Sequence, residues 1–216
     1  MGQYYMAYVI DDNGYTKVYN PNSVGYGLKL TENANMPSKL VNSVLRDILN
    51  EPKRVAWVGD YASDVDDEEK LAKLAKYITP NADCVPNPHP LNFDKLEDYA
   101  GWFLLNHDKK ECISLSKYIN KNARIMVGEY ELADGQRKRD LDMFCMSPLA
   151  LLTACGNGMG GGDYRGTDEA EVGRWAFDLI EFRKGSETYS FNPTYHGFKL
   201  INPRFVDSWV DAEWGE

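Results

Sequence analysis

A helix that passes directly into a buried strand, over residues 37–60, constrains the fold of this chain more than any other stretch. In PSKLVNSVLRDILNEP, apolar residues recur along one helix face: Leu40, Val41, Val44, Leu45, Ile48 and Leu49. Ser38 can cap this helix, and Pro52 ends it. The β-branched and aromatic run RVAWVGD follows at once and predicts a buried strand that ends at Gly59-Asp60.

Signals for strands and turns dominate the rest of the chain. Residues 3–10 and 15–19 flank DDNG, a sequence with a strong hairpin preference. Residues 101–115, GWFLLNHDKKECISL, predict a strand, a charged turn and a second strand. Further apolar runs are ARIMVGEYEL, DMFCMSPLALLTAC and VGRWAFDLIEFR, with the polar loop DGQRKRD after the first. The second run is compatible with a strand or with a short helix opened by Pro148.

The stretch DVDDEEKLAKLAKYI, residues 64–78, predicts a second helix. Asp66 and Glu69 have the spacing of a capping box, and the acids lie at the positive end of the helix dipole. The expected inner face is Leu71, Leu74, Ala75 and Ile78, and the lysines expected to point outward are Lys70, Lys73 and Lys76. Capping and solvation therefore account for most of this acidic run.

These elements predict an α+β fold, with a mixed or antiparallel sheet, hairpins and two or three helices that cover one face. We expect residues 1–216 to form a single domain, because the length suits one domain and no internal repeat is present. Four prolines between residues 79 and 95 predict a long irregular loop.

Composition excludes several classes of protein. The net charge of −9 argues against direct binding of nucleic acid, which requires clustered basic residues, and no apolar run is long enough to span a membrane. The start of the chain lacks the features of a secretory signal, and the four cysteines form no Cys-x-x-Cys pair. We therefore expect reduced thiols, a cytoplasmic location, and neither a metal site nor a cofactor.

The segment GNGMGGGDYRG, residues 156–166, is the strongest candidate for recognition and is called the glycine segment below. Its glycines can adopt positive φ and expose backbone N–H groups, which together form a cradle for an anion. The spacing fits neither a Walker loop nor a dinucleotide-binding fingerprint with its flanking strand and helix. The candidate ligand-binding residues here are Gly158, Gly160, Gly161, Gly162, Asp163, Tyr164 and Arg165. Arg165 offers a bidentate contact and Tyr164 a stacking face.

The run VGRWAFDLIEFR, residues 172–183, predicts one more central strand. Alternation in a strand places Arg174 and Asp178 on one face, with Trp175 and Phe177 on the opposite, core-facing side. Arg174 and Asp178 then either face solvent or line a pocket.

Several motifs together resemble a family of small proteins found in bacteria and their phages. They are MGQYY at residues 1–5, YGLKL at 26–30, AWVGDYA at 56–62, LLNHDKK at 104–110, the glycine segment, and VGRWAFDLI at 172–180. Phe177 differs from the glycine that the family usually has before the aspartate. Because no activity is established for that family, the resemblance implies no chemistry. It implies that the glycine segment, Asp60 and the strand from Arg174 to Asp178 converge in space.

The sequence favours a binding protein over an enzyme, and it indicates no catalytic residue. In the leading hypothesis, the ligand is an anionic, nucleotide-like small molecule held by the glycine segment with Asp60, Arg174 and Asp178, and the role is phage antidefence. An alternative is an acidic module that inhibits or binds a host protein through residues 60–69 and the tryptophans of the C-terminal segment. A third is a metal-dependent hydrolase that uses Asp60, Asp163 or Asp178.

Overall fold

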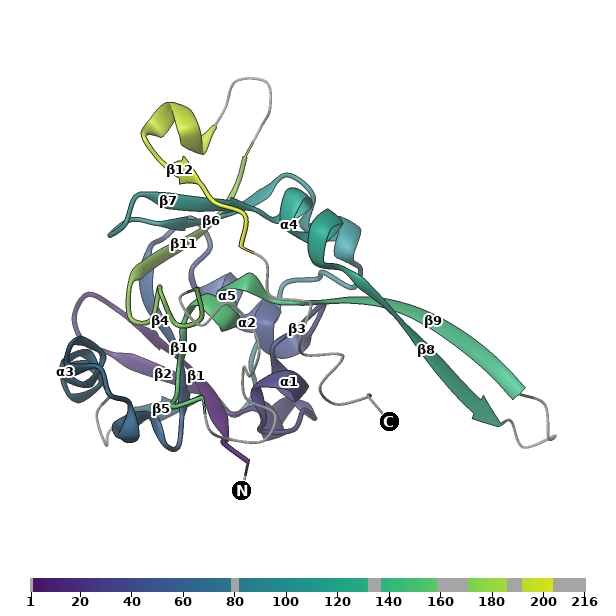
Figure 1. Ribbon diagram of the computed structural model, residues 1–216, viewed down its shortest axis with the longest axis horizontal. Coiled ribbons are helices and arrows are strands. Elements are labelled where there is room, and N and C mark those ends of the chain that lie inside the picture. Colours follow the sequence, from purple (N-terminus) through teal and green to yellow (C-terminus); the bar gives the residue numbers. More distant parts are fainter. Residues whose placement is uncertain (1, 79–81, 132–136, 159–170, 186–191, 204–216) are drawn as a thin grey trace.

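The computed structural model describes residues 2–78, 82–131, 137–158, 171–185 and 192–203. Its main sheet is mixed, and among the described residues it has nine strands in the order β12-β7-β6-β11-β4-β1-β2-β5, with β10 also beside β4 (Figure 1). The strands are β1 Tyr5–Ile10, β2 Thr16–Tyr19, β4 Lys53–Gly59, β5 Asp83–Cys84, β6 Trp102–Asn106, β7 Glu111–Ser114, β10 Ala154–Cys155, β11 Leu179–Lys184 and β12 Lys199–Leu200. The predicted α+β class is confirmed.

A second sheet is built around a long hairpin that extends away from the main body (Figure 1). Its strands are β3 Asn35–Met36, β8 Arg124–Glu131 and β9 Arg137–Met146. β3 pairs with β9 only at its base, Cys145–Met146, whereas β8 pairs with β9 along its whole length. The predicted polar loop, residues 134–140, is therefore partly strand.

The α-helices are α1 Leu30–Asn33, α2 Lys39–Asp47, α3 Glu68–Tyr77, α4 Leu115–Asn122 and α5 Pro148–Leu152, and four 3₁₀ turns are Pro21–Val24, Ala62–Asp64, Leu96–Tyr99 and Pro193–His196. Helix α2 confirms the first prediction. The Ser38 hydroxyl accepts the Val41 N–H at 3.1 Å, and Leu40, Val41, Val44 and Leu45 are buried. α2 packs with Val55 and Trp57 of β4 in the larger core.

Helix α3 covers the opposite face of the sheet, so the expectation that one face is covered was wrong. Ala56 belongs to the core cluster that Leu74 and Tyr77 of α3 cover, whereas Val55 and Trp57 belong to the larger core. Neighbouring residues of a strand point to opposite faces. α3 lies to one side of the β1–β4 region in Figure 1.

The cap and the faces of α3 also differ from the prediction. Asp67 rather than Asp66 caps the helix, through the Lys70 N–H at 3.0 Å. Lys70 and Lys73 are half-buried instead of pointing outward, whereas Ala75 is exposed. The helix begins at Glu68. Its face toward the sheet carries the half-buried residues Lys70, Leu71 and Leu74.

The predicted strand over residues 172–183 forms only in its second half, as β11. Residues 171–177 are a series of turns, because Gly173 and Phe177 have φ of +70° and +63°. Residues 147–155 contain both α5 and β10, which settles the ambiguity between helix and strand.

Between residues 82 and 95 the only regular element is the two-residue strand β5. No helix in the described part of the chain is long and apolar enough to cross a membrane.

Candidate functional site

Two parallel strands end side by side at one edge of the main sheet. Residues 53–54 of β4 pair with β11, but residues 57–58 pair with β10, so the neighbour of β4 changes along its length. The β4–β10 pair is parallel, and the strands lead into Gly59-Asp60 and Gly156-Asn157-Gly158. In open α/β sheets, ligands bind beyond the carboxyl ends of strands at a point where connectivity switches. We call this edge the strand-end site.

The N-terminal residues of the chain complete the strand-end site. The Tyr4 N–H donates to Asp60 Oδ1 at 3.0 Å, and the Asp60 N–H donates to the Tyr4 carbonyl at 3.0 Å. Side chains lie so close to Gly59 and Gly156 that neither glycine has room for a Cβ: Gln3 lies against Gly59, and the Tyr5 hydroxyl against Gly156. The structure therefore brings together Asp60 and the beginning of the glycine segment.

The Gln3 side chain has one unsatisfied donor at this site. Gln3 is fully buried, and its Oε1 accepts the Tyr5 hydroxyl at 3.0 Å. Its Nε2 has no hydrogen-bond partner among the described residues. A buried N–H without an acceptor is costly, so native proteins nearly always supply a partner from the protein, water or a ligand.

Only the start of the glycine segment lies among the described residues. Gly158 has φ of +68°, a conformation that favours glycine, in agreement with the reasoning from sequence. The other predicted ligand residues, Gly160, Gly161, Gly162, Asp163, Tyr164 and Arg165, lie outside the described ranges.

A lysine lies beside β10 on the face that α3 covers. The Lys70 ammonium is 3.5 Å from the position that a Cβ would take at Gly173, and it forms an ion pair with Asp67 at 3.7 Å. Burial raises the pKa of the Cys155 thiol to about 11 despite the opposing charge of Lys70. Cys155 therefore remains a protonated core residue, with the Lys70 charge nearby.

Arg174, which was predicted to contact a ligand, is paired with carboxylates of the protein itself. Its guanidinium forms ion pairs with Glu171, at 2.7 Å, and with Glu111. The Trp175 indole N–H donates to the other oxygen of Glu111 at 2.9 Å. These two carboxylates neutralise Arg174, and the network fixes residues 171–175 onto β7.

Asp178 is likewise committed to contacts within the protein. This residue is 2% exposed, and its Oδ2 accepts from Asn106 at 2.9 Å and from Lys109 at 2.7 Å. Lys73 of α3 donates to Oδ1 at 3.4 Å. Burial lowers the pKa of Lys73, but Glu69 and Asp178 outweigh burial and raise it overall. Asp178 thus joins α3 to the β6–β7 turn.

The predicted convergence is therefore partial. Asp60 and Gly156 follow the neighbouring ends of β4 and β10, and Gly173 packs against the carbonyl of Ala154 in β10. The charged groups of Arg174 and Asp178 have separate partners instead. Sequence reasoning assigned no role to Gln3, Glu111 or Lys109, although MGQYY and LLNHDKK, two of the motifs that carry the resemblance, contain Gln3 and Lys109.

No group of three or more His, Cys, Asp or Glu residues suited to a metal ion occurs within the described ranges. A scan against protein-family models found no match, and searches of curated proteins and of solved structures found none either.

Proposed function

We propose that this protein binds a small anionic, nucleotide-like molecule at the strand-end site. The observation that carries the proposal is the unpartnered Nε2 of Gln3, buried where β4 and β10 end in parallel. This donor lies against Gly59 at the end of β4, and Oε1 of the same carboxamide lies against Gly156, where the glycine segment begins. A ligand oxygen within hydrogen-bond distance of Nε2 would satisfy that donor.

The chemistry expected of the site is hydrogen bonding from bare backbone and from one carboxamide. Gln3 donates to a ligand oxygen, and the backbone N–H groups of the predicted ligand glycines, Gly158 and those that follow it, surround the anion. Arg165 and Tyr164 keep their predicted roles in charge pairing and stacking. Arg174 is withdrawn from the ligand set, because Glu111 and Glu171 already neutralise its charge.

A hydrolytic role fits the described carboxylates less well. Both oxygens of Asp178 already accept hydrogen bonds from ammonium or amide groups, which a metal ion would have to displace. Asp60 Oδ1 is bonded to the Tyr4 backbone. These contacts support recognition rather than catalysis.

The cellular setting belongs to the same proposal. Cys84, Cys112, Cys145 and Cys155 are all free, as in a reducing cytoplasm where nucleotides are abundant. A cytoplasmic protein that sequesters a nucleotide signal would suit an antidefence role for a phage.

Thermal denaturation in the presence of nucleotides tests the proposal. We expect AMP, ADP, cyclic AMP or pyrophosphate to raise the melting temperature, because a ligand that binds only the folded state stabilises it. Gln3→Met removes the donor and should abolish the shift. Tyr5→Phe breaks the same Gln3–Tyr5 hydrogen bond but keeps the donor, so its shift should persist. If none of the four compounds stabilises the folded wild-type protein, the proposal fails.

A second candidate function, binding of a protein partner, is favoured by the β8–β9 hairpin. The hairpin extends away from the main body (Figure 1), and an isolated two-stranded ribbon is marginally stable in water. Of the acids in residues 60–69 all but Asp67 are exposed, so Asp64 and Asp66 can face a basic partner.

Pulldown with Asp64→Lys/Asp66→Lys tests this candidate. Asp67 is left intact, because it caps α3. The control variant carries charge reversals at the exposed residues Asp12 and Glu97. If this control still captures a partner that the Asp64/Asp66 variant loses, the candidate is supported. Equal capture by both variants would count against the acidic surface.

A further inference from the structure

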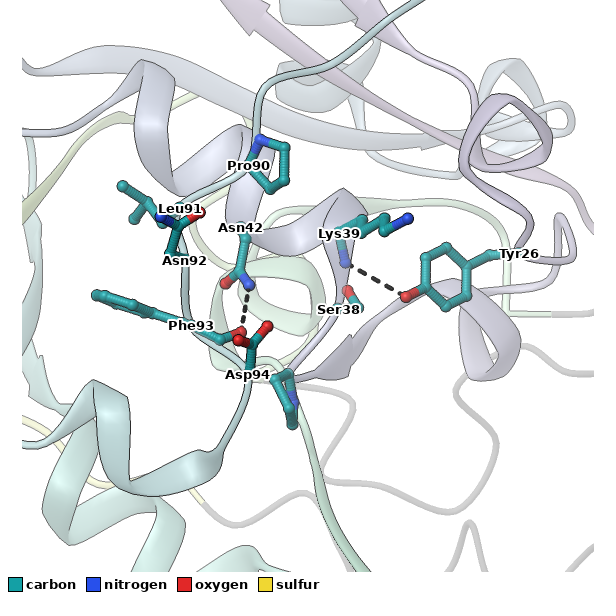
Figure 2. Close-up of a pocket in the computed structure, with 10 residues that line it drawn as sticks. Tyr26, Ser38, Lys39, Asn42, Pro90, Leu91, Asn92, Phe93 and Asp94 are labelled. Carbon is teal, nitrogen blue, oxygen red and sulfur yellow. Dashed lines mark hydrogen bonds between the residues drawn. The ribbon is translucent and has the colours of Figure 1, made fainter.

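A pocket of about 410 Å³ lies at the start of α2, and none of its lining residues belongs to the strand-end site (Figure 2). We call it the α2 pocket. Its floor includes Ser38 and Asn42, one wall is Tyr26, and the opposite wall is the stretch 90–94. Its volume lies within the range, about 300–1,000 Å³, of pockets that hold small molecules.

Hydrogen bonds within the protein hold the floor of the α2 pocket in place. Asn42 is 3% exposed, accepts the Tyr99 hydroxyl at 2.6 Å and donates to the Phe93 carbonyl at 2.8 Å. These bonds attach the wall at Phe93 to α2, as Figure 2 shows for the second bond. The pocket therefore needs no rearrangement of its floor before a ligand enters.

Tyr26 offers a hydroxyl proton at the opposite wall. Its oxygen accepts the Lys39 N–H at 3.3 Å (Figure 2), and its own O–H has no acceptor within the described ranges. That O–H is available to a ligand oxygen.

Two unpaired charges of opposite sign line the pocket. Lys39 and Asp94 are exposed, and neither makes an ion pair with another described residue. Lys39 is the first residue of α2, and no acid occupies the first turn. A cation at a helix N-terminus is unfavourable, so the position of Lys39 does not serve the helix itself. The Asp94 side chain takes no part in the turn that follows, where Asp98 accepts the Asp94 and Lys95 N–H groups.

We infer that the α2 pocket binds a small zwitterion, a molecule with one carboxylate and one ammonium group. The carboxylate pairs with the Lys39 ammonium and accepts the Tyr26 hydroxyl, and the ammonium pairs with Asp94. A simple anion would be repelled by Asp94, and a simple cation by Lys39, whereas a zwitterion satisfies both charges. Amino acids, ω-amino acids and short peptides share this chemistry and differ in the separation of their charges.

Isothermal titration with zwitterions of increasing length tests the inference. The probes are glycine, γ-aminobutyrate, 6-aminohexanoate and dialanine, each compared with its N-acetylated and its amidated form. We expect at least one uncapped probe to bind, and capping of either end to weaken its binding about tenfold or more, because each capped end loses a charge-assisted hydrogen bond.

Two variants and two controls assign the binding to this pocket. Lys39→Glu and Asp94→Asn should each weaken binding of the best probe by about tenfold or more. Lys39→Glu should not lower the melting temperature, since an acid favours a helix N-terminus, so its loss of binding cannot come from unfolding. The exposed controls Lys117→Met and Asp12→Asn should bind as the wild type does.

Three results would overturn the inference: no probe binds at millimolar concentration, capped probes bind as well as uncapped ones, or both pocket variants retain full affinity. None of these results bears on the strand-end site, because the two sites share no residue.

Discussion

Replacement of Gly156 by alanine should destabilise the protein by packing a methyl group against the N-terminal residues. The new Cβ would overlap the buried Tyr5 hydroxyl and lie 2.8 Å from Gln3 Oε1 and 2.9 Å from Tyr5 Cζ. Overpacking a core costs about 1–3 kcal/mol, and separating the Tyr5–Gln3 hydrogen bond adds about 1 kcal/mol. We therefore expect a loss of about 2–4 kcal/mol in the free energy of unfolding.

The matched variant for this prediction is Tyr5→Phe, which removes the overlapped hydroxyl. Wild type, the two single variants and the double variant form a double-mutant cycle. Urea denaturation, followed by the fluorescence of the buried Trp57 and Trp175, measures the free energy of unfolding of all four proteins. The double variant should recover about 1–2 kcal/mol relative to the sum of the single changes, as expected for two residues in contact. A loss below about 0.5 kcal/mol for Gly156→Ala, or strict additivity of the two changes, would refute the packing of the glycine segment onto MGQYY.

Three further predictions concern charged groups. Asp67→Ala should cost about 1 kcal/mol in unfolding free energy and Asp66→Ala almost nothing, because Asp67 is the cap of α3; equal losses would contradict the assignment. Asp178→Asn should cost about 1–3 kcal/mol by chemical denaturation, because the buried Asn106 amide and the partly exposed Lys109 lose their carboxylate; a neutral effect would show that these bonds contribute little. Burial raises the pKa of Asp108, but hydrogen bonds from Arg54 and the Leu179 N–H, with the charges of Arg54 and Lys109, outweigh burial and lower this pKa overall. The ionised form is therefore favoured in the folded state, and the stability it contributes should disappear as pH falls through that lowered value. Asp108→Asn should remove this part of the acid sensitivity, and an unchanged pH profile would contradict it.

Elements with a clear period were predictable from local sequence. β4 and the beginning of α2 lie within about two residues of their expected positions, because the apolar spacing and Ser38 indicate the same structure. The end of α2 differs: the helix stops at Asp47, before Pro52. Residues 171–177 were not predictable from alternation, because the conformation of Phe177 depends on tertiary contacts. Its N–H donates to the Val55 carbonyl, and its carbonyl accepts from Arg54. These contacts impose a left-handed backbone on a residue that reads as strand.

The sequence predicted only those parts of the candidate site whose position follows from local backbone conformation. Positive φ at Gly158 follows from the glycine pattern, and the ends of β4 and β10 explain why Asp60 lies nearby. Apart from Glu171, the partners of Arg174 and Asp178 come from β6, β7, the β6–β7 turn and α3, which are distant in sequence. Charge pairing across such distances leaves no local signal, so these residues were indistinguishable from ligand contacts.

The most direct test of the central claim is the side-chain amide resonance of Gln3, observed by ¹H–¹⁵N NMR and assigned by its absence in Gln3→Met. The account predicts that AMP, ADP, cyclic AMP or pyrophosphate shifts this resonance, together with the backbone amides of Gly156 and Gly158, when the ligand binds. A bound nucleotide that leaves all three resonances in place would contradict it.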